Sequence, residues 1–439
     1  MQRLIYTSLL TWKSNKYRKP LIIKGGRQVG KTYILKKFAK EYRNCIYVNF
    51  EESSKIAAFF AGDINPTNII NNLQIHFNQS ISPGETLIIF DEIQECPEAL
   101  NSLKYFNEHA NEYHIAAAGS LLGIKLNRSK GFPVGKVDFL ELKPLSFFEF
   151  LNAMGKEKLY ELLISLKNFN PINKLFHDDL LNLLKQYLVI GGMPEAVKIF
   201  IKANDFSQVR KIQKAILDAY TLDFAKHAPA NETMKIMNIW QSIPNQLAKE
   251  NKKFIFAAIH KSARAREYQT AIQWLLDAGL IYNSFKINTP KLPLDAYADK
   301  SAFKIYMLDV GLLGAMAKLS PKIITQGSEL FTEFKGAFTE NFVTQELIAN
   351  NSDQLYYWTS AGSAEVDFIL EHQSVVFPLE VKAGKSTLAK SLKIYAQKYK
   401  ANSILRTNLL NFKHDDIVYN YPLYAIGLFD KLNPITMEK

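Results

Sequence analysis

No part of the sequence limits the possible folds more than Gly25-Gly-Arg-Gln-Val-Gly-Lys-Thr32, which matches the pattern GxxxxGK[ST]. An apolar run, Leu21–Ile23, precedes this stretch, and a segment with helically spaced Ile34, Leu35 and Phe38 follows it. A strand, a glycine-rich turn and a helix in this order form a loop whose backbone N–H groups wrap a polyphosphate. The sequence therefore predicts a parallel α/β sheet that binds a nucleotide at this loop.

The loop also indicates which residues contact the nucleotide and its metal ion. We expect Lys31 to neutralise the β- and γ-phosphates and the Thr32 hydroxyl to coordinate Mg²⁺, so ATP and Mg²⁺ are the expected cofactors. A glycine-rich turn without a ligand is the alternative. The residues expected at the ATP site are Gly25, Gly26, Arg27, Gln28, Val29, Gly30, Lys31, Thr32 and Tyr33.

A second motif, Thr86-Leu-Ile-Ile-Phe-Asp-Glu92, is an apolar strand that ends in two carboxylates. After a phosphate loop, such a strand predicts that Asp91 joins the Mg²⁺ shell and that Glu92 polarises the attacking water. A solvated strand end is the alternative. The following strand, His114–Ser120, ends in a hydroxyl that we expect to sense the γ-phosphate near Asp91, unless Ser120 is an ordinary strand-end serine.

The hydrophobic pattern divides the chain into four expected domains. Up to about residue 150, apolar runs alternate with helical stretches, which is typical of a parallel sheet covered on both faces. Residues 151–229 have a helical pattern and are expected to form a lid or linker. Residues 230–310 and residues 311–439 are expected to form the third and fourth domains. The runs expected as strands of the first domain are Leu21–Ile23, Cys45–Phe50, Leu87–Phe90, Ile115–Ala118 and Val137–Leu142.

Residues 230–310 are expected to form a winged helix. A short helix over Phe254–His260 precedes an amphipathic helix that ends at Gly279, and Leu280–Ile287 would pair with Phe303–Leu308 as a wing. The second helix of such a unit can enter a major groove of DNA. Basic side chains near the turn support phosphate contacts, although a protein contact or a merely solvated face explains them as well. These side chains are Lys252, Lys253, Lys261, Arg264 and Arg266.

The last domain carries the pattern Glu, Asp, Glu-x-Lys. Strand Ser363–Leu370 and strand Val375–Lys382 would form a hairpin that brings Asp367 beside Glu380 and Lys382. This geometry suits a divalent cation held by Asp367 and Glu380, with Glu340 from an earlier helix completing the shell and Lys382 positioning water. The pattern looks like the PD-(D/E)xK nuclease signature. A cross-strand salt bridge between Lys382 and the acids is the competing interpretation.

Composition excludes several function classes. Lys and Arg exceed Asp and Glu to give a net charge of +12, which favours a polyanionic partner without requiring one. Two cysteines exclude a disulfide framework and a four-thiolate zinc site. No apolar run is long enough to span a membrane and no signal peptide is recognisable, so we expect a cytoplasmic protein without a membrane partner.

Five segments together resemble a bacterial and archaeal family of AAA-like ATPases with a C-terminal domain of unknown function 4143. They are GGRQVGKT, LIIFDEIQE, AAAGSLLG, GFPVGKVDFLELKPLSFFEFL and YLVIGGMPEAV. The resemblance implies a P-loop ATPase core, a helical and winged-helix middle and a restriction-endonuclease-like end. AAA-like ATPases usually complete their site with an arginine from a neighbouring subunit, so the resemblance implies a homo-oligomer. Arg128 is the expected finger, ahead of Lys136, because lysine cannot make the bidentate contact.

The sequence therefore predicts an ATP-hydrolysing enzyme that acts on or with DNA and carries a Mg²⁺-dependent, nuclease-like C-terminal domain. The expected catalytic residues are Lys31, Glu92, Ser120, Arg128 and Lys382. The alternative is a nucleotide-controlled regulatory switch whose C-terminal domain binds but does not cleave.

Overall fold

The computed structural model describes residues 1–62, 64–120, 133–248, 253–326, 332–350, 354–387 and 390–437. The chain forms two compact units. The first comprises residues 2–143 with 277–279, and the second comprises the remainder, essentially 144–276 and 280–439. The predicted end of the first domain, near residue 150, lies close to this boundary.

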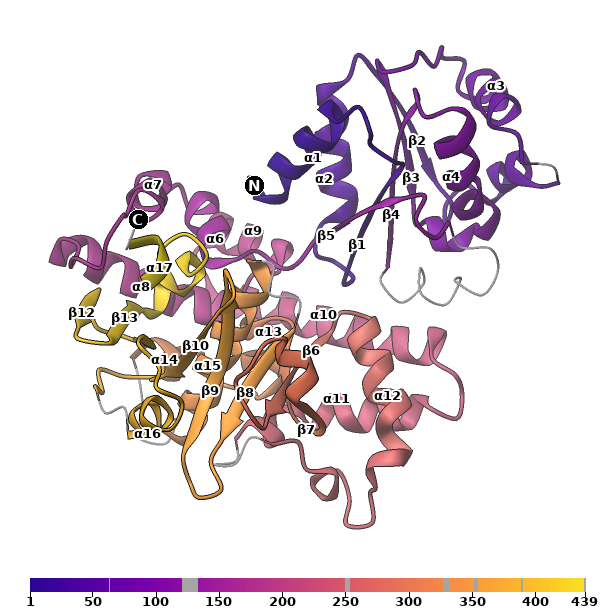
Figure 1. The fold of residues 1–439 in the computed structure, drawn as a ribbon. Helices are drawn as coiled ribbons and strands as arrows, with labels where there is room; N and C mark the ends of the chain where they lie inside the picture. Colours follow the sequence, from indigo (N-terminus) through magenta and orange to yellow (C-terminus); the bar gives the residue numbers. More distant parts are fainter. Residues whose placement is uncertain are drawn as a thin grey trace. The chain divides into compact units, whose positions relative to one another are not determined.

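The N-terminal unit is built around a parallel sheet with strand order β2-β3-β4-β1-β5. Its strands lie where the sequence predicts them, so the α/β prediction is confirmed. On one side of the sheet lie α1 and α2, and on the other lie α3 and α4 (Figure 1). The strands are β1 (Leu21–Gly25), β2 (Asn44–Asn49), β3 (Thr86–Asp91), β4 (His114–Ser120) and β5 (Asp138–Glu141). The helices are α1 (Ile5–Ser14), α2 (Lys31–Phe38), η1 (Ala39–Glu41), η2 (Ser54–Phe60), α3 (Pro66–Phe77), η3 (Ile93–Glu95) and α4 (Pro97–His109).

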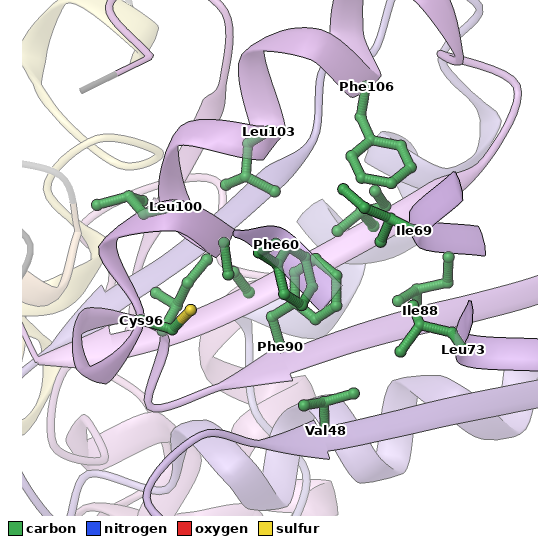
Figure 2. Close-up of a cluster of buried hydrophobic side chains, with 14 of the residues drawn as sticks. Val48, Phe60, Ile69, Leu73, Ile88, Phe90, Cys96, Leu100, Leu103 and Phe106 are labelled. Carbon is green, nitrogen blue, oxygen red and sulfur yellow. The ribbon is translucent and has the colours of Figure 1, made fainter. Parts of the chain in front are cut away.

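An apolar core joins the sheet to α3 and α4. Side chains from β3, such as Ile88 and Phe90, pack with Leu103 and Phe106 of α4 and with Leu73 of α3 (Figure 2). All are at most 1% exposed. Because β3 is buried along its whole length, its last residue reaches the sheet edge with a fixed backbone.

The second unit begins with a helical region, which includes the residues after 150 that have a helical sequence pattern. Its helices are α6 (Phe147–Ala153), α7 (Glu157–Ile164), α8 (Lys174–Ile190), α9 (Pro194–Ala203), α10 (Phe206–His227), α11 (Thr233–Leu247), η5 (Phe256–Ala258), α12 (Ala265–Asp277), α13 (Val310–Met316) and α14 (Pro321–Gln326). The helix expected over 254–260 is only the short η5. Phe254 N–H bonds to Phe303 O and Ile255 N–H bonds to the Gln246 side chain, which holds the start of this segment extended.

An eight-stranded mixed sheet follows, in the order β12-β13-β11-β10-β9-β8-β6-β7. The expected antiparallel pair of β6 and β7 is present, but β6 also pairs in parallel with β8, so these two strands belong to the same sheet as the C-terminal strands. The strands are β6 (Ile281–Ile287), β7 (Ala298–Met307), β8 (Leu355–Thr359), β9 (Glu365–His372), β10 (Val375–Val381), β11 (Ile404–Asn408), β12 (Lys413–Asp415) and β13 (Val418–Pro422). The helices among them are η6 (Leu294–Tyr297), α15 (Thr332–Ala349), α16 (Lys390–Tyr399), η8 (Leu423–Leu428) and α17 (Pro434–Met437).

The glycine pair of the YLVIGGMPEAV segment has a packing role. Gly191 has a φ of +74°, and a Cβ there would overlap the Asp309 carboxylate. A Cβ at Gly192 would overlap the carbonyl oxygen of Leu145. The Asp309 carboxylate accepts a 2.6 Å hydrogen bond from Gly192 N–H and caps α13 through Leu312 N–H at 2.9 Å. These glycines therefore allow the end of α8 to approach α13 closely.

Candidate functional site

The phosphate loop lies between β1 and α2, as predicted. Gly30 precedes α2 with a φ of 98°, a left-handed conformation that glycine adopts without strain. Gly25 is packed so closely against the backbone of Leu142 that a Cβ would overlap its carbonyl oxygen. Gly30, at the N-cap, has no side chain that could cap the start of α2. The first N–H groups of the helix therefore point into the loop, where they suit an anion.

Lys31 lies inside this loop. Its ammonium donates hydrogen bonds to the carbonyl oxygens of Gly25, at 3.1 Å, and Gly26, at 2.9 Å, and the residue is only 8% exposed. Burial lowers the pKa of Lys31 to about 8, against the opposing attraction of Glu92 and Asp91. The ammonium is thus held near the loop by neutral partners that a phosphate can replace.

The carboxylates predicted to serve hydrolysis lie at the end of β3. Asp91 is 1% exposed, and its Oδ2 accepts a 2.8 Å hydrogen bond from the Tyr47 hydroxyl of the neighbouring β2. Glu92 has a left-handed backbone with a φ of 50°, and its Oε2 accepts a 2.6 Å hydrogen bond from the Gln94 amide. Burial and the hydrogen bond to Asp91 raise the pKa of Tyr47. Both carboxylates are therefore oriented by neighbours that the sequence analysis did not identify.

Ser120 ends β4, the strand between β1 and β3. The register places Ser120 beside Gly25, the first residue of the phosphate loop. Ser120 thus lies at the end of the strand that separates β1, which leads into the loop, from β3, which ends in Asp91. The arrangement joins a hydroxyl at Thr32, a buried carboxylate at Asp91 and a cation at Lys31, a donor set that fits a nucleotide with a hard divalent ion.

One side chain ties the loop to the end of the sheet and had no signal in the sequence. The Arg3 guanidinium, in a residue 6% exposed, donates hydrogen bonds to Val29 O at 3.1 Å and to Lys143 O at 2.5 Å. Arg128, the expected arginine finger, lies outside the described residues. Its weaker competitor Lys136 forms an ion pair with Glu108 at 3.0 Å.

In the C-terminal sheet, β9 and β10 form the predicted antiparallel hairpin. Asp367 Oδ2 accepts a 2.8 Å hydrogen bond from Val381 N–H, and Glu380, 5% exposed, pairs with Lys382 at 2.6 Å. Arg406 of β11 lies beside Glu380 in the register. The hairpin thus carries Asp367 and Glu380 on neighbouring strands, and the Glu380–Lys382 pair is a salt bridge of the kind expected under the competing interpretation.

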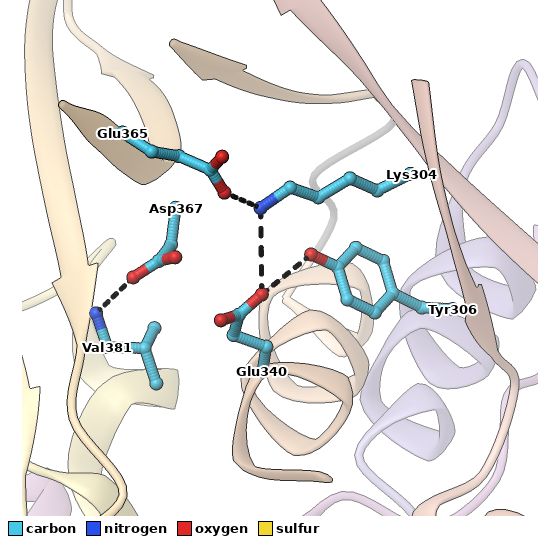
Figure 3. A network of polar contacts seen from close by, with 6 residues as sticks. All are labelled: Lys304, Tyr306, Glu340, Glu365, Asp367 and Val381. Atoms are coloured by element: carbon cyan, nitrogen blue, oxygen red, sulfur yellow. Dashed lines mark hydrogen bonds and ion pairs between the residues drawn. The ribbon is translucent and has the colours of Figure 1, made fainter. Parts of the chain in front are cut away.

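Glu340, the expected third ligand, lies in a network with Lys304, Glu365 and Asp367, which Figure 3 shows. Its Oε2 accepts a 3.1 Å hydrogen bond from the Tyr306 hydroxyl and lies 3.7 Å from the ammonium of Lys304. The Lys304 Nζ is 2.5 Å from Oε1 of Glu365. Among the residues that the structure describes, no group of three His, Cys, Asp or Glu side chains is arranged to hold a metal ion.

Lys304 was not a candidate residue, because nothing in the sequence links β7 to the hairpin. Burial alone would lower the pKa of its ammonium, but nearby negative and polar groups raise that pKa well above its usual range. These groups are Tyr306, Glu340, Glu365 and Asp367. Lys304 is thus a fully buried cation within the carboxylate cluster.

Three family descriptions match separate parts of the chain: AAA domain over residues 17–151, Domain of unknown function (DUF8612) over 181–323 and Domain of unknown function (DUF4143) over 335–426. The predicted AAA-like ATPase domain and the predicted domain of unknown function 4143 are therefore confirmed. No curated protein matches the sequence. Across the described helices, none combines the length and the apolar character that a membrane span needs.

Solved structures similar to the chain include the Walker-type ATPase PABY2304 of Pyrococcus abyssi, with 13% identity, coverage of 72% of this chain and 95% of that chain, and a TM-score of 0.44. The Aeropyrum pernix Orc1 protein in complex with DNA has 12% identity, coverage of 73% and 93%, and a TM-score of 0.30. Unliganded Pif1 from a Bacteroides species has 15% identity, coverage of 41% and 51%, and a TM-score of 0.23. At these values the likenesses carry no functional argument.

Proposed function

We propose that this chain hydrolyses ATP at the loop Gly25–Thr32 and that the nucleotide state controls its contact with DNA. ATP hydrolysis is supported above all by the carboxylates of Asp91 and Glu92 at the end of the buried β3. Hydrogen bonds from Tyr47 and Gln94 orient these two carboxylates. Binding alone needs the loop, whereas hydrolysis also needs a group that orients or activates the attacking water, a role that a carboxylate can fill.

The residues divide the chemistry among them. Thr32 and Asp91 would hold a divalent cation, which would neutralise charge on the phosphate oxygens. Lys31 would exchange its loop carbonyls for the β- and γ-phosphates. Glu92 would accept a proton from the attacking water, and Ser120 would contact the γ-phosphate from the adjacent strand.

A pair of variants tests this assignment. Lys31→Ala should abolish phosphate release while the thermal unfolding curve stays unchanged. Glu92→Gln should bind ATP as tightly as the wild type but hydrolyse it at least 100-fold more slowly, roughly the contribution of a general base. Wild-type turnover in the Lys31→Ala variant would contradict the assignment.

The proposed DNA contact rests on charge around η5 and α12. Lys253, Lys261, Arg264 and Arg266 are all exposed in this region. Such a cluster can neutralise several phosphates, and this makes binding strongly dependent on salt. The described turn and helix are followed by the β6–β7 pair, the order expected for a winged helix.

Charge reversal of this cluster has a matched control. The double variant Arg264→Glu/Arg266→Glu should weaken DNA binding at least tenfold and reduce its salt slope. The double variant Lys198→Glu/Lys202→Glu makes the same charge change at exposed positions on α9 and should have a smaller effect. Equal losses in both would indicate nonspecific attraction by the net charge instead of a DNA-binding face.

Assembly through Arg128 remains part of the proposal. If a neighbouring subunit supplies this arginine, the ATPase rate per chain rises with protein concentration. Mixing Arg128→Ala with a Glu92→Gln chain should then restore activity that neither has alone, because one subunit supplies the finger and the other the catalytic glutamate. An ATPase rate per chain that changes neither with protein concentration nor on mixing the variants would contradict an arginine supplied by a neighbouring subunit.

The second candidate function is a nucleotide-controlled switch whose C-terminal domain binds without cleaving. The network of Lys304, Glu340 and Glu365 favours this candidate over metal-dependent cleavage. Incubation of plasmid DNA with Mn²⁺ and either wild-type protein or Lys382→Ala should give equally small losses of supercoiled DNA. Loss that depends on Lys382 would favour the nuclease.

A further inference from the structure

We propose that the ammonium of Lys304 is the resident cation of the C-terminal carboxylate cluster, so that this cluster takes no divalent metal ion and cleaves no phosphodiester. The cluster consists of Glu340, Glu365, Asp367 and Glu380. The proposal is independent of ATP hydrolysis in the other unit.

The position of Lys304 is the first observation. Its side chain is 0% exposed, and Nζ lies 2.5 Å from Glu365 and 3.7 Å from Glu340. In Figure 3 the ammonium points toward Glu340 and Glu365, and the Asp367 carboxylate lies nearby with its own contact to Val381. A buried ammonium needs partners that offset its lost hydration, and here they are the carboxylates of Glu365 and Glu340 and the ring of Tyr357, whose centroid lies 4.8 Å from Nζ. The ammonium of Lys304 therefore supplies the positive charge near Glu340, Glu365 and Asp367 that a bound metal ion would otherwise supply.

The second observation is that individual carboxylate oxygens already accept hydrogen bonds from the chain. Glu340 Oε2 accepts from the Tyr306 hydroxyl at 3.1 Å, and Asp367 Oδ2 accepts from Val381 N–H at 2.8 Å. A divalent ion needs several oxygens turned toward one point. One oxygen of Glu340 and one of Asp367 are thus already bound to donors of the chain itself.

The fourth carboxylate has its own basic neighbours. Glu380 Oε1 lies 2.6 Å from the Lys382 ammonium, and Arg406 is its register partner on β11. The residues predicted to hold a metal ion are thus divided between two positively charged groups. A metal ion entering between them would meet the charges of Lys304 and Lys382 at short range.

Counting bound Mn²⁺ tests the proposal. Free Mn²⁺ is measured by electron paramagnetic resonance in the full chain without nucleotide, so any ion at the phosphate loop is common to all samples. Asp367→Asn, which keeps an oxygen for Val381 N–H, should bind the same number of ions as the wild type. Lys304→Met, which keeps the side-chain length without the charge, should bind one ion more. Lys304→Met/Asp367→Asn should lose that extra ion.

Lys300→Met provides the matched control, because Lys300 lies on the same strand but its side chain is 63% exposed. It should add no ion. If Asp367→Asn binds one ion fewer than the wild type, the native cluster holds a metal and the proposal is overturned. If folded Lys304→Met gains no ion, Lys304 is not what excludes the metal, and the proposal is overturned as well. Should Lys304→Met fail to fold, the comparison of wild type with Asp367→Asn still decides.

Discussion

The Tyr47 hydroxyl donates a 2.8 Å hydrogen bond to Oδ2 of Asp91, from β2 to the adjacent β3. Asp91 is at the end of its strand and is 1% exposed, so groups of the protein, not water, set the orientation of its carboxylate. Glu92 N–H donates to the other oxygen at 3.1 Å. Tyr47 is therefore a positioning residue: it fixes the carboxylate that would hold the cation but has no place in the chemistry itself.

Tyr47→Phe should lower the ATPase kcat roughly 3- to 10-fold, since one positioning hydrogen bond is worth about 1 kcal/mol. It should also raise the Mg²⁺ concentration needed for half-maximal rate, which a purely structural defect would not do. Steady-state turnover over a Mg²⁺ series measures both. Tyr17→Phe, at a residue 89% exposed, is the control and should match the wild type. An unchanged Mg²⁺ dependence in Tyr47→Phe would remove this role.

The pKa of Lys31 predicts how ATP affinity depends on pH. Burial lowers this pKa to about 8, and bound phosphates would raise it again because they attract the ammonium. Above pH 8, ATP binding must then be accompanied by proton uptake. The ATP association constant should fall up to about tenfold per pH unit between pH 8 and the pKa of the complex.

Calorimetry of ATP binding in buffers with different ionisation enthalpies checks this prediction. In the Glu92→Gln background, which prevents turnover, proton uptake at pH 9 should approach one proton per ATP and should be small at pH 7. Lys31→Met should show no uptake at either pH. Uptake that persists without Lys31 would assign the proton to another group.

The nucleotide site was predictable because its parts are local. Gly25–Thr32 lies between a strand and a helix that adjoin it in sequence, and Asp91 ends a strand that is apolar throughout. Tyr47 was not predictable, because a tyrosine on an alternating strand carries no sign of what its hydroxyl contacts. Its bond to Asp91 depends on the pairing of β2 with β3.

The C-terminal site shows the opposite case. The hairpin of β9 and β10 was predicted from alternation, so the neighbourhood of Asp367 and Glu380 was correct. Lys304 lies on β7, and it reaches Glu365 only because β6, β7, β8 and β9 belong to one sheet. The sequence pattern predicts residues 230–310 as a separate domain and therefore does not predict the contact between Lys304 and Glu365. No local pattern indicates which distant strands share a sheet.

The two glycines after α8 allow a packing prediction with a close control. Gly191→Ala should destabilise the second unit by at least about 2 kcal/mol, because alanine would be strained at a φ of +74° and would overlap the Asp309 carboxylate. Gly155→Ala has a φ of +68° but no atom within 4 Å of the added Cβ, so it should cost only the backbone strain. Urea unfolding of both variants separates the cost of backbone strain from the cost of the overlap with Asp309. Equal losses would mean that contact with Asp309 adds nothing.

Glu346 of α15 offers a test by pH. It is 1% exposed, its Oε1 accepts a 2.8 Å hydrogen bond from Phe147 N–H, and Oε2 has no hydrogen-bond partner among the described residues. Burial raises its pKa from the ordinary value of 4.5 to about 8. The folded chain therefore holds a proton that the unfolded chain releases above pH 4.5. The contribution of this proton to the free energy of unfolding is fully present below pH 4.5. It is lost progressively as the pH rises from 4.5 to about 8.

Glu346→Gln removes this ionisation and keeps an oxygen for Phe147 N–H. The variant should be more stable than the wild type by about 2–4 kcal/mol at pH 9, with a smaller difference at pH 5.5. Urea unfolding at the two pH values measures the change. Glu157→Gln, at an exposed position in α7, should leave the pH dependence as it is in the wild type. If Glu346→Gln shows the wild-type slope, the carboxyl group is ionised in the folded chain, and an interaction that stabilises the charge must offset its burial.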